Sequence, residues 1–213
     1  MAELIKKTAW QTIILIFITQ FLIIAQDVKL PEPQKEGGIP LMEAINKRKS
    51  SRKFISKQLS SQVLSNLFWA AYGFNRPEKE MRTVPSAWNI QNISVYIAKS
   101  DGLYLYDAAN NLLKLILRED IRQYTGKQSY VNNVPVNLIY VADLSMMSRV
   151  REKAKFYSAA QTGFIAQNVY LFCASFNLGT VVRDLIDRDN LRKLMNLKTS
   201  EEIILAQSVG YLK

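Results

Sequence analysis

The chain has 213 residues, 48% of them hydrophobic, with a formal net charge of +10 and no histidine. This length and apolar content fit one domain with a substantial core, and the absence of histidine excludes histidine-based triads and histidine-bearing zinc sites. We expect no metal site. The single cysteine, Cys173, cannot form an intramolecular disulfide, and its apolar surroundings, VYLFCASF, are typical of a buried core residue.

The first 25 residues differ from the rest of the chain. Lys6 and Lys7 precede the apolar stretch TIILIFITQFLIIA, which ends at the small residue Ala25. This pattern predicts an export signal cleaved after residue 25, and hence a periplasmic or secreted protein. The alternative is an uncleaved membrane anchor, because residues 9–25 reach the minimum spanning length of about 17 residues.

Residues 26–40 contain three prolines and two glycines among charged residues. They predict a linker or an extended arm outside the core, so the folded domain should comprise residues 41–213. Leu41, Met42 and Ile45 have helical spacing, and this short helix should end where the basic cluster KRKSSRKF begins.

A second helix is predicted after Ser60 or Ser61, either of which can cap it, and it should end at Gly73. A proline-containing loop follows. Hydrophobic patterning then predicts strands at 93–98, 102–107, 134–143, 178–184 and 201–211, a long helix from about 149 to 177 and a short helix at 188–195 capped by Asp187. Residues 111–120 are ambiguous between helix and strand.

The long helix is apolar nearly all round, which is typical of a buried central helix. Helices and strands alternate irregularly along the chain, and this order favours an α+β layered fold. The two common nucleotide-binding loops, G-x-G-x-x-G and G-K-[ST], do not follow any predicted strand.

The basic cluster has two interpretations from its residues alone. It can be a solvated turn, or one attracted to an anionic membrane. It can also be a phosphate site, because arginine forks and serine hydroxyls suit phosphate oxygens.

Four stretches, in this order, give the chain a resemblance to a known family: NKRKSSRKF, RTVPSAWNIQ, QNVYLFCASFNLGTVVRD and AQSVGYLK. The chain resembles the FMN-dependent nitroreductase family, in particular its SagB-type dehydrogenase branch, over roughly residues 41–213. The resemblance implies an α+β nitroreductase-like fold, with a mainly antiparallel central sheet flanked by helices around a buried central helix. It also implies a homodimer whose flavin sites lie between the subunits.

The resemblance also implies which residues contact the FMN. Arg48, Lys49, Ser50 and Arg52 would bind the phosphate, the ribityl chain and the pyrimidine edge of the flavin, where a cation raises its reduction potential. A loop supplied by the neighbouring subunit would contribute Pro85, Ser86, Ala87, Asn89 and Gln91. The remaining contacts would come from Gln128 to the ring, from Val182, Arg183 and Asp184 near N5, and from Lys213 to the phosphate.

The predicted function is therefore an FMN-dependent oxidoreductase that moves a hydride through flavin N5 in a ping-pong cycle. NAD(P)H or another donor would supply the hydride, and an electron-poor small molecule would accept it. The flavin performs the chemistry, so we predict no catalytic protein residue. An exported protein has little access to NAD(P)H, and a partner redox protein or, in the SagB-like case, oxygen would then replace the usual partner.

The alternative is a non-enzymatic basic module that binds an anionic membrane surface or nucleic acid. The charge of residues 26–213 supports it, because removing two lysines and one glutamate from +10 leaves +9. Against it, the cations are spread along the chain and no nucleic-acid-binding motif is recognisable, so nucleic acid is not an expected partner.

Overall fold

The structure is a computed structural model that describes residues 26–213. The predicted export signal or anchor, residues 1–25, lies outside the described residues. Among the helices of residues 26–213, none combines the length and the apolar character that crossing a bilayer requires.

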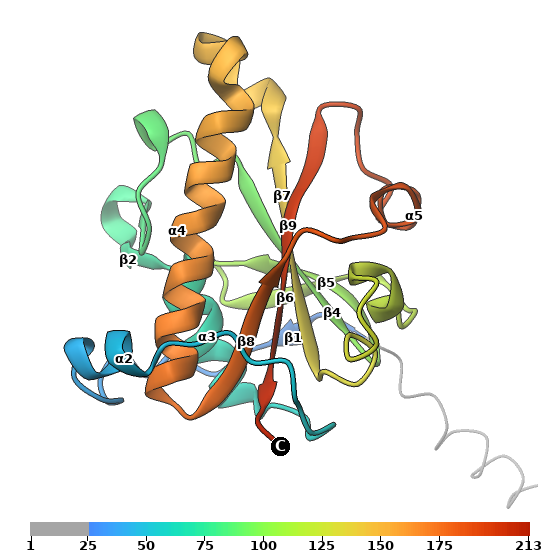
Figure 1. The fold of residues 1–213 in the computed structure, drawn as a ribbon. Helices are drawn as coiled ribbons and strands as arrows, with labels where there is room; N and C mark the ends of the chain where they lie inside the picture. The colour runs from blue at the N-terminus through green and yellow to red at the C-terminus, as the bar shows by residue number, and fades with distance from the viewer. Residues whose placement is uncertain (1–25) are drawn as a thin grey trace, which may run out of the picture.

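One seven-stranded sheet forms the centre of the molecule (Figure 1). Its strand order is β1-β6-β5-β4-β7-β9-β8, and every neighbouring pair is antiparallel. The strands are β1 (Val28–Lys29), β4 (Ile93–Lys99), β5 (Gly102–Asp107), β6 (Leu112–Leu117), β7 (Val136–Asp143), β8 (Leu178–Arg183) and β9 (Glu201–Tyr211). The predicted antiparallel α+β fold is confirmed.

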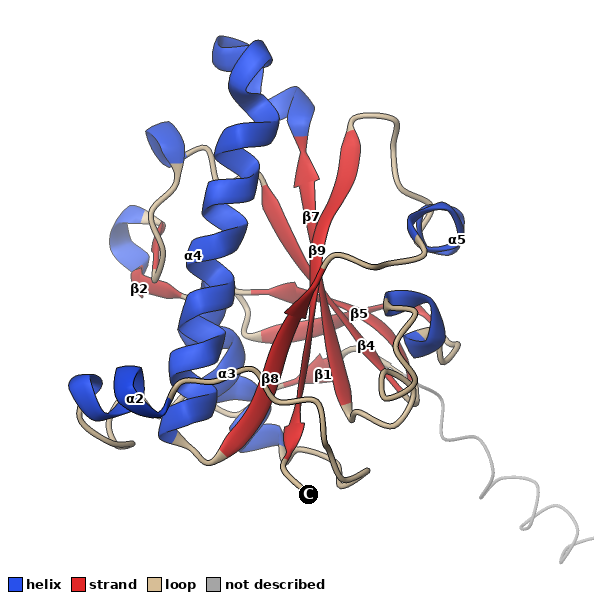
Figure 2. Cartoon of the chain, in the orientation of Figure 1, coloured by secondary structure: helices blue, strands red, loops and turns tan. Residues whose placement is uncertain are grey.

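Helices cover both faces of this sheet (Figure 2). On one face lie α2 (Leu41–Lys47), α3 (Ser61–Tyr72) and α4 (Ala154–Ser175), and on the other lie α5 (Arg188–Leu194) and the 3-10 helix η3 (Arg122–Thr125). The remaining short elements are β2 (Phe74–Arg76), η1 (Pro77–Lys79), β3 (Met81–Arg82), η2 (Ala87–Asn89) and η4 (Leu144–Lys153).

The alternation of side chains along each strand builds two cores. In β7, Leu138 and Tyr140 belong to the cluster beneath α3 and α4. Their neighbours Ile139 and Val141 belong to the cluster beneath α5. The central strands are therefore apolar on both faces.

Local signals fixed the helix ends well. The Ser60 side chain accepts a hydrogen bond from the Val63 N–H at the start of α3, and the helix ends at Gly73. Asp187 caps α5 in the same way through the Asn190 N–H. The long helix is shorter than predicted, because residues 144–153 form the 3-10 helix η4 before α4 begins.

Two regions differ from the sequence-based expectations. The ambiguous segment is the strand β6, which pairs with β5. The arm was expected to lie outside the core, but Val28 and Lys29 pair with β6, and Leu30 is only 2% exposed within the main core. An edge strand of two residues has no periodicity, so the sequence pattern could not reveal it.

Candidate functional site

The chain leaves α2 as an extended segment of residues 48–53, which we call the basic stretch. The Ser51 N–H donates a hydrogen bond to the Thr180 carbonyl in β8 (2.9 Å), and the N–H of Lys213 donates to the Lys53 carbonyl (3.3 Å). The basic stretch is thereby held along the ends of β8 and β9. The fold brings the last residue of the chain beside it.

Tyr170, in the C-terminal half of α4, joins two of the predicted flavin-binding segments. The Arg48 guanidinium carbon lies 5.3 Å from the centroid of its ring, and the Ser50 Oγ lies 2.8 Å from its hydroxyl. The same hydroxyl accepts a hydrogen bond from the Val182 N–H (3.1 Å). Since that oxygen already accepts from the backbone, it can donate its own proton to Ser50, which leaves the Ser50 proton free for an anionic ligand.

Two pockets flank the basic stretch. One has a volume of about 370 Å³ and is lined by Lys47, Lys49 and Tyr170, among others. The second, which we call the cationic pocket, has a volume of about 500 Å³. It is lined by Arg52, Lys53, Phe54, Tyr130, Asn133 and Lys213.

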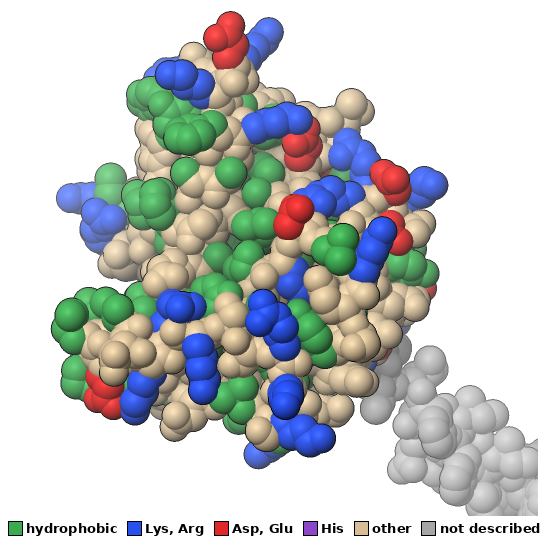
Figure 3. Space-filling view, in the orientation of Figure 1, with side chains coloured by type: hydrophobic (Ala, Val, Ile, Leu, Met, Phe, Trp, Pro, Cys, Tyr) green, Lys and Arg blue, Asp and Glu red, His purple; other side chains and the backbone are tan. Residues whose placement is uncertain are grey.

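The side chains that line these two pockets carry more positive charge than their ion pairs neutralise. Lys47 pairs with Glu43 at 2.7 Å, and none of the other lining cations has an ion-pair partner within residues 26–213. Figure 3 shows Lys and Arg side chains gathered over this lower face of the molecule. Such a surface suits a phosphate group.

Gln128 precedes Tyr130, a lining residue of the cationic pocket, by two positions. Its side-chain oxygen is buried and accepts no hydrogen bond within the described chain. Buried polar atoms normally have a partner, so this oxygen is suited to a ligand N–H. A flavin carries such an N–H on its pyrimidine ring. The cations, the Ser50 hydroxyl and the Gln128 oxygen therefore fit the predicted cofactor.

The side chains of Arg183 and Asp184 are engaged within the chain. Arg183 is only 4% exposed and donates hydrogen bonds to the Thr125 carbonyl and to Asn137 Oδ1. The Asp184 carboxylate is exposed and pairs with Arg188 at 2.6 Å. Direct contact of these two residues with a ligand would therefore come from their backbone.

The second predicted half of the site is residues 85–91, which we call the proline loop. Trp88, Asn89 and Gln91 all have left-handed backbone conformations. The Gln91 N–H donates to Ser86 Oγ (3.1 Å), and Gln91 Nε2 donates to Asn89 Oδ1 (2.9 Å). The amides assigned to the flavin by resemblance thus hold the loop in shape, while Asn89 itself remains exposed. Pro85 is exposed too, and Ala87 is half-buried.

Arg82 fastens the proline loop to the end of α3. Its guanidinium carbon lies 3.9 Å from the centroid of the Tyr72 ring and 4.5 Å from that of Phe74. Its Nε donates to Gln91 Oε1 (2.7 Å), and burial lowers the pKa of the Arg82 guanidinium. Arg82 is absent from the residues predicted from the sequence, although it is the first residue of the motif RTVPSAWNIQ.

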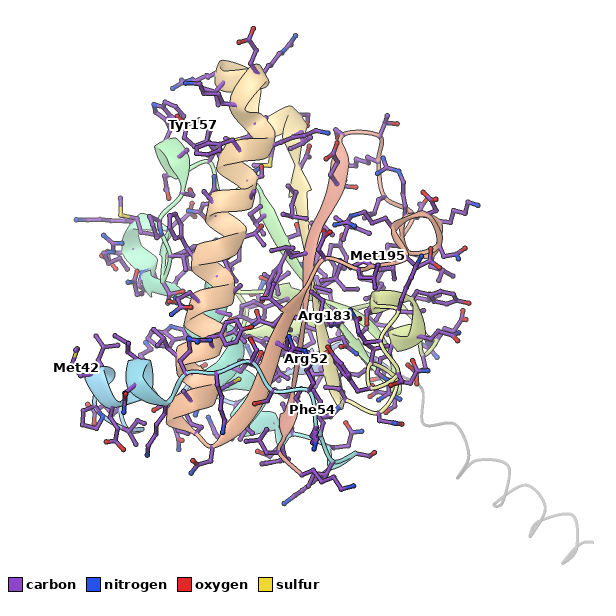
Figure 4. All side chains as sticks on the ribbon, in the orientation of Figure 1. Met42, Arg52, Phe54, Tyr157, Arg183 and Met195 are labelled. Atoms are coloured by element: carbon purple, nitrogen blue, oxygen red, sulfur yellow. The ribbon has the colours of Figure 1, made fainter. Side chains whose placement is uncertain are left out.

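The proline loop and the basic stretch lie at different ends of α4. The Trp88 ring packs edge-on against Tyr157 (5.6 Å between centroids), whereas Arg48 and Ser50 contact Tyr170, thirteen residues further along. At 1.5 Å per residue, this separation is about 20 Å. Figure 4 shows Tyr157 near the upper end of the helix, far from Arg52. One chain therefore does not bring the two predicted halves of the site together.

Comparison with known proteins identifies the family. The sequence model of the Nitroreductase family matches residues 45–211. A candidate nitroreductase of Methanocaldococcus jannaschii is 30% identical over 195 residues, which cover 86% of this chain and 96% of that protein.

Two solved structures share the fold. The crystal structure of a candidate nitroreductase from Ralstonia eutropha JMP134 is 39% identical, with a TM-score of 0.84, over 89% of this chain and 90% of that one. The NADPH:FMN oxidoreductase from Vibrio harveyi complexed with NAD+ is 17% identical, with a TM-score of 0.60, over 81% of this chain and 69% of that one. By sequence and by fold, the chain belongs to the nitroreductase family.

Proposed function

We propose that this nitroreductase-family oxidoreductase binds FMN between two copies of the chain. The observation that carries the proposal is the meeting of Arg48, Ser50 and Val182 on Tyr170, which lines a pocket together with Lys47 and Lys49. Arg52, four residues after Arg48, lines the cationic pocket. Three separate segments of the chain supply these groups. The match to an NADPH:FMN oxidoreductase fold also supports the proposal.

FMN held here would supply hydride-transfer chemistry between NAD(P)H or another donor and an electron-poor acceptor, in a ping-pong cycle. The residues of the chain bind and orient it. Arg48 and Lys213 neutralise the phosphate, and Ser50 donates its free proton to a phosphate or ribityl oxygen. Arg52 offers positive charge to the pyrimidine edge, and the Gln128 oxygen accepts from the ring N–H.

Apolar side chains that one chain leaves exposed support the homodimer. Met42 on α2 is 74% exposed, Phe156 on α4 is 69% exposed and Trp88 in the proline loop is 57% exposed. α2 packs beside α4, and the Trp88 and Phe156 rings both contact Tyr157. Figure 3 shows hydrophobic side chains along this side of the molecule. A second copy would bury this surface and bring its proline loop to the basic stretch.

The visible spectrum of the purified protein tests the proposal. We expect a yellow protein that takes up FMN stoichiometrically and loses its colour when NAD(P)H is added without oxygen. Reduction by an organic substrate but not by NAD(P)H would favour the SagB-type branch. A colourless protein that ignores excess FMN and binds heparin in a salt-dependent manner would contradict the proposal and favour the basic binding module.

A further inference from the structure

Arg183 is a buried cation, and its hydrogen-bond partners within residues 26–213 are all uncharged. Its Nη1 donates to the Thr125 carbonyl, and its Nη2 donates to Asn137 Oδ1 (2.8 Å), an atom that also accepts from Ser208 Oγ (2.6 Å). The Arg183 Nε has no hydrogen-bond partner within residues 26–213. The ion pairs of this part of the chain do not include Arg183.

This guanidinium remains charged at neutral pH. Burial lowers the pKa of Arg183 to about 10, which is still well above the physiological range. A buried charge without a counter-charge is costly in free energy. In most proteins such a group is neutralised or is paired with an opposite charge. The stability of the fold therefore does not explain why a charged residue occupies this buried position.

The loop that follows η3 adjoins Arg183 at Gly126 and lines the cationic pocket with Tyr130. A Cβ built on Gly126 would lie 2.0 Å from Arg183 Nη1 and 2.6 Å from Gln128 Oε1, so the guanidinium and the orphaned amide oxygen crowd the same glycine. Further along the same loop, Tyr130 lines the pocket and packs its ring 5.8 Å from that of Phe54.

The same side chain also fixes the position of this loop. Arg183 holds one end of the loop through the Thr125 carbonyl, and Asn137, its partner in β7, donates to the Val131 carbonyl at the other end (2.9 Å). Gln128 and Tyr130 lie between these two points. Loss of the guanidinium would therefore affect both the loop geometry and the local electrostatic potential.

We propose that Arg183 is a positioning residue for the flavin that acts from behind the pocket wall. It fixes the loop that carries Gln128, and it supplies a permanent positive charge that favours the reduced, more negatively charged cofactor. In a region of low dielectric constant, such a charge acts over several ångströms without contact. This inference rests on the proposed function, because it requires the site to hold FMN.

The test measures the affinity of the dimer for oxidised and for reduced FMN, together with the midpoint potential, in Arg183→Met and Arg183→Lys. We expect Arg183→Met to weaken binding of reduced FMN about tenfold more than binding of oxidised FMN. For a two-electron couple, this corresponds to a midpoint potential about 30 mV lower. Arg183→Lys keeps the charge and should keep a potential close to that of the wild type.

Arg122→Met is the matched control. Arg122 holds the same loop region through the Val134 carbonyl (3.0 Å), but its charge is paired with Asp120 at 2.6 Å. We expect Arg122→Met to change both FMN affinities equally and to leave the potential unchanged. An equal loss in both redox states for Arg183→Met would show that Arg183 is only structural and would overturn the inference.

A second variant keeps the test decisive if Arg183→Met does not fold. Asn137→Asp places a carboxylate against the Arg183 guanidinium, so the charge is neutralised while Arg183 stays in place. The variant also loses the hydrogen bond to the Val131 carbonyl, and this effect on the loop should weaken both FMN affinities equally. We expect the same selective loss for reduced FMN, and an unchanged potential would overturn the inference. Wild-type protein that binds no FMN at all would instead overturn the proposed function.

Discussion

The basic stretch is bound to several distant segments of its own chain, whereas the proline loop is held mainly by contacts within and next to itself. Residues 48–53 bond to β8 and to Lys213, and Arg48 and Ser50 contact Tyr170. The proline loop is fixed internally by Gln91 and anchored by Arg82, but it leaves Trp88 on the surface. The basic stretch is thus bound to several other segments, whereas the proline loop is held in shape but keeps its aromatic residue exposed within the described chain.

This contrast is the one that we expect in each copy if the proposed site lies between two subunits. The proline loop uses several hydrogen bonds to hold residues with left-handed backbone conformations, yet its aromatic side chain stays exposed. We infer that this costly conformation is maintained for contact with a ligand or a second chain. The basic stretch shows the complementary property, since Lys49, Arg52 and Lys53 line two pockets and have no ion-pair partner within residues 26–213. The following changes separate the two roles, in order of decreasing effect.

Replacing both Arg48 and Arg52 with alanine should cause the largest loss. Two charge-assisted contacts to FMN disappear, and we expect its affinity to fall by about 100-fold or more. Absorbance of the purified protein at the flavin bands measures the occupancy. Arg76→Ala with Lys79→Ala removes two exposed cations elsewhere and should not change it. Wild-type occupancy in the Arg48 and Arg52 variant would refute the phosphate assignment.

Mixed dimers should show that the two regions serve the same site from different chains. Ala87→Phe fills the space that the flavin ring needs, so its homodimer should bind little FMN, as should that of the Arg48→Ala, Arg52→Ala variant. A heterodimer of the two, isolated by two different affinity tags, contains one site with both halves intact. We expect about half the wild-type FMN content. No recovery in a stable heterodimer would mean that each chain builds its site alone.

Tyr170→Phe should have the smallest effect. It removes the hydroxyl shared by Ser50 and Val182 but keeps the ring under Arg48, so we expect about a tenfold weaker FMN affinity, equivalent to roughly 1.4 kcal/mol. Titration with FMN, followed by fluorescence quenching, measures this change. Tyr106→Phe, in β5 and outside the site, serves as the control. A loss as large as that of the double arginine variant would indicate that Tyr170 supports the fold of the region.

The sequence predicted the local features of this protein because their causes are local. Ser60 and Gly73 mark the ends of α3 through hydrogen bonds within a few residues, and alternating apolar residues predicted the β4–β5 hairpin. The family was also recognisable, because the order of its motifs is itself a property of the sequence. The site residues assigned by that resemblance stay predictions.

Only the tertiary structure determined which distant groups meet. Ser50 and Tyr170 are 120 residues apart, and β1 pairs Val28 with Leu113 in β6, so no local pattern could report these contacts. The same holds for the direction of the Arg183 side chain, which the sequence did not indicate and which the fold places in the protein interior against Asn137. Periodicity and capping determine individual elements over a few residues. Packing between those elements decides which charges stay exposed and which are buried without a counter-charge.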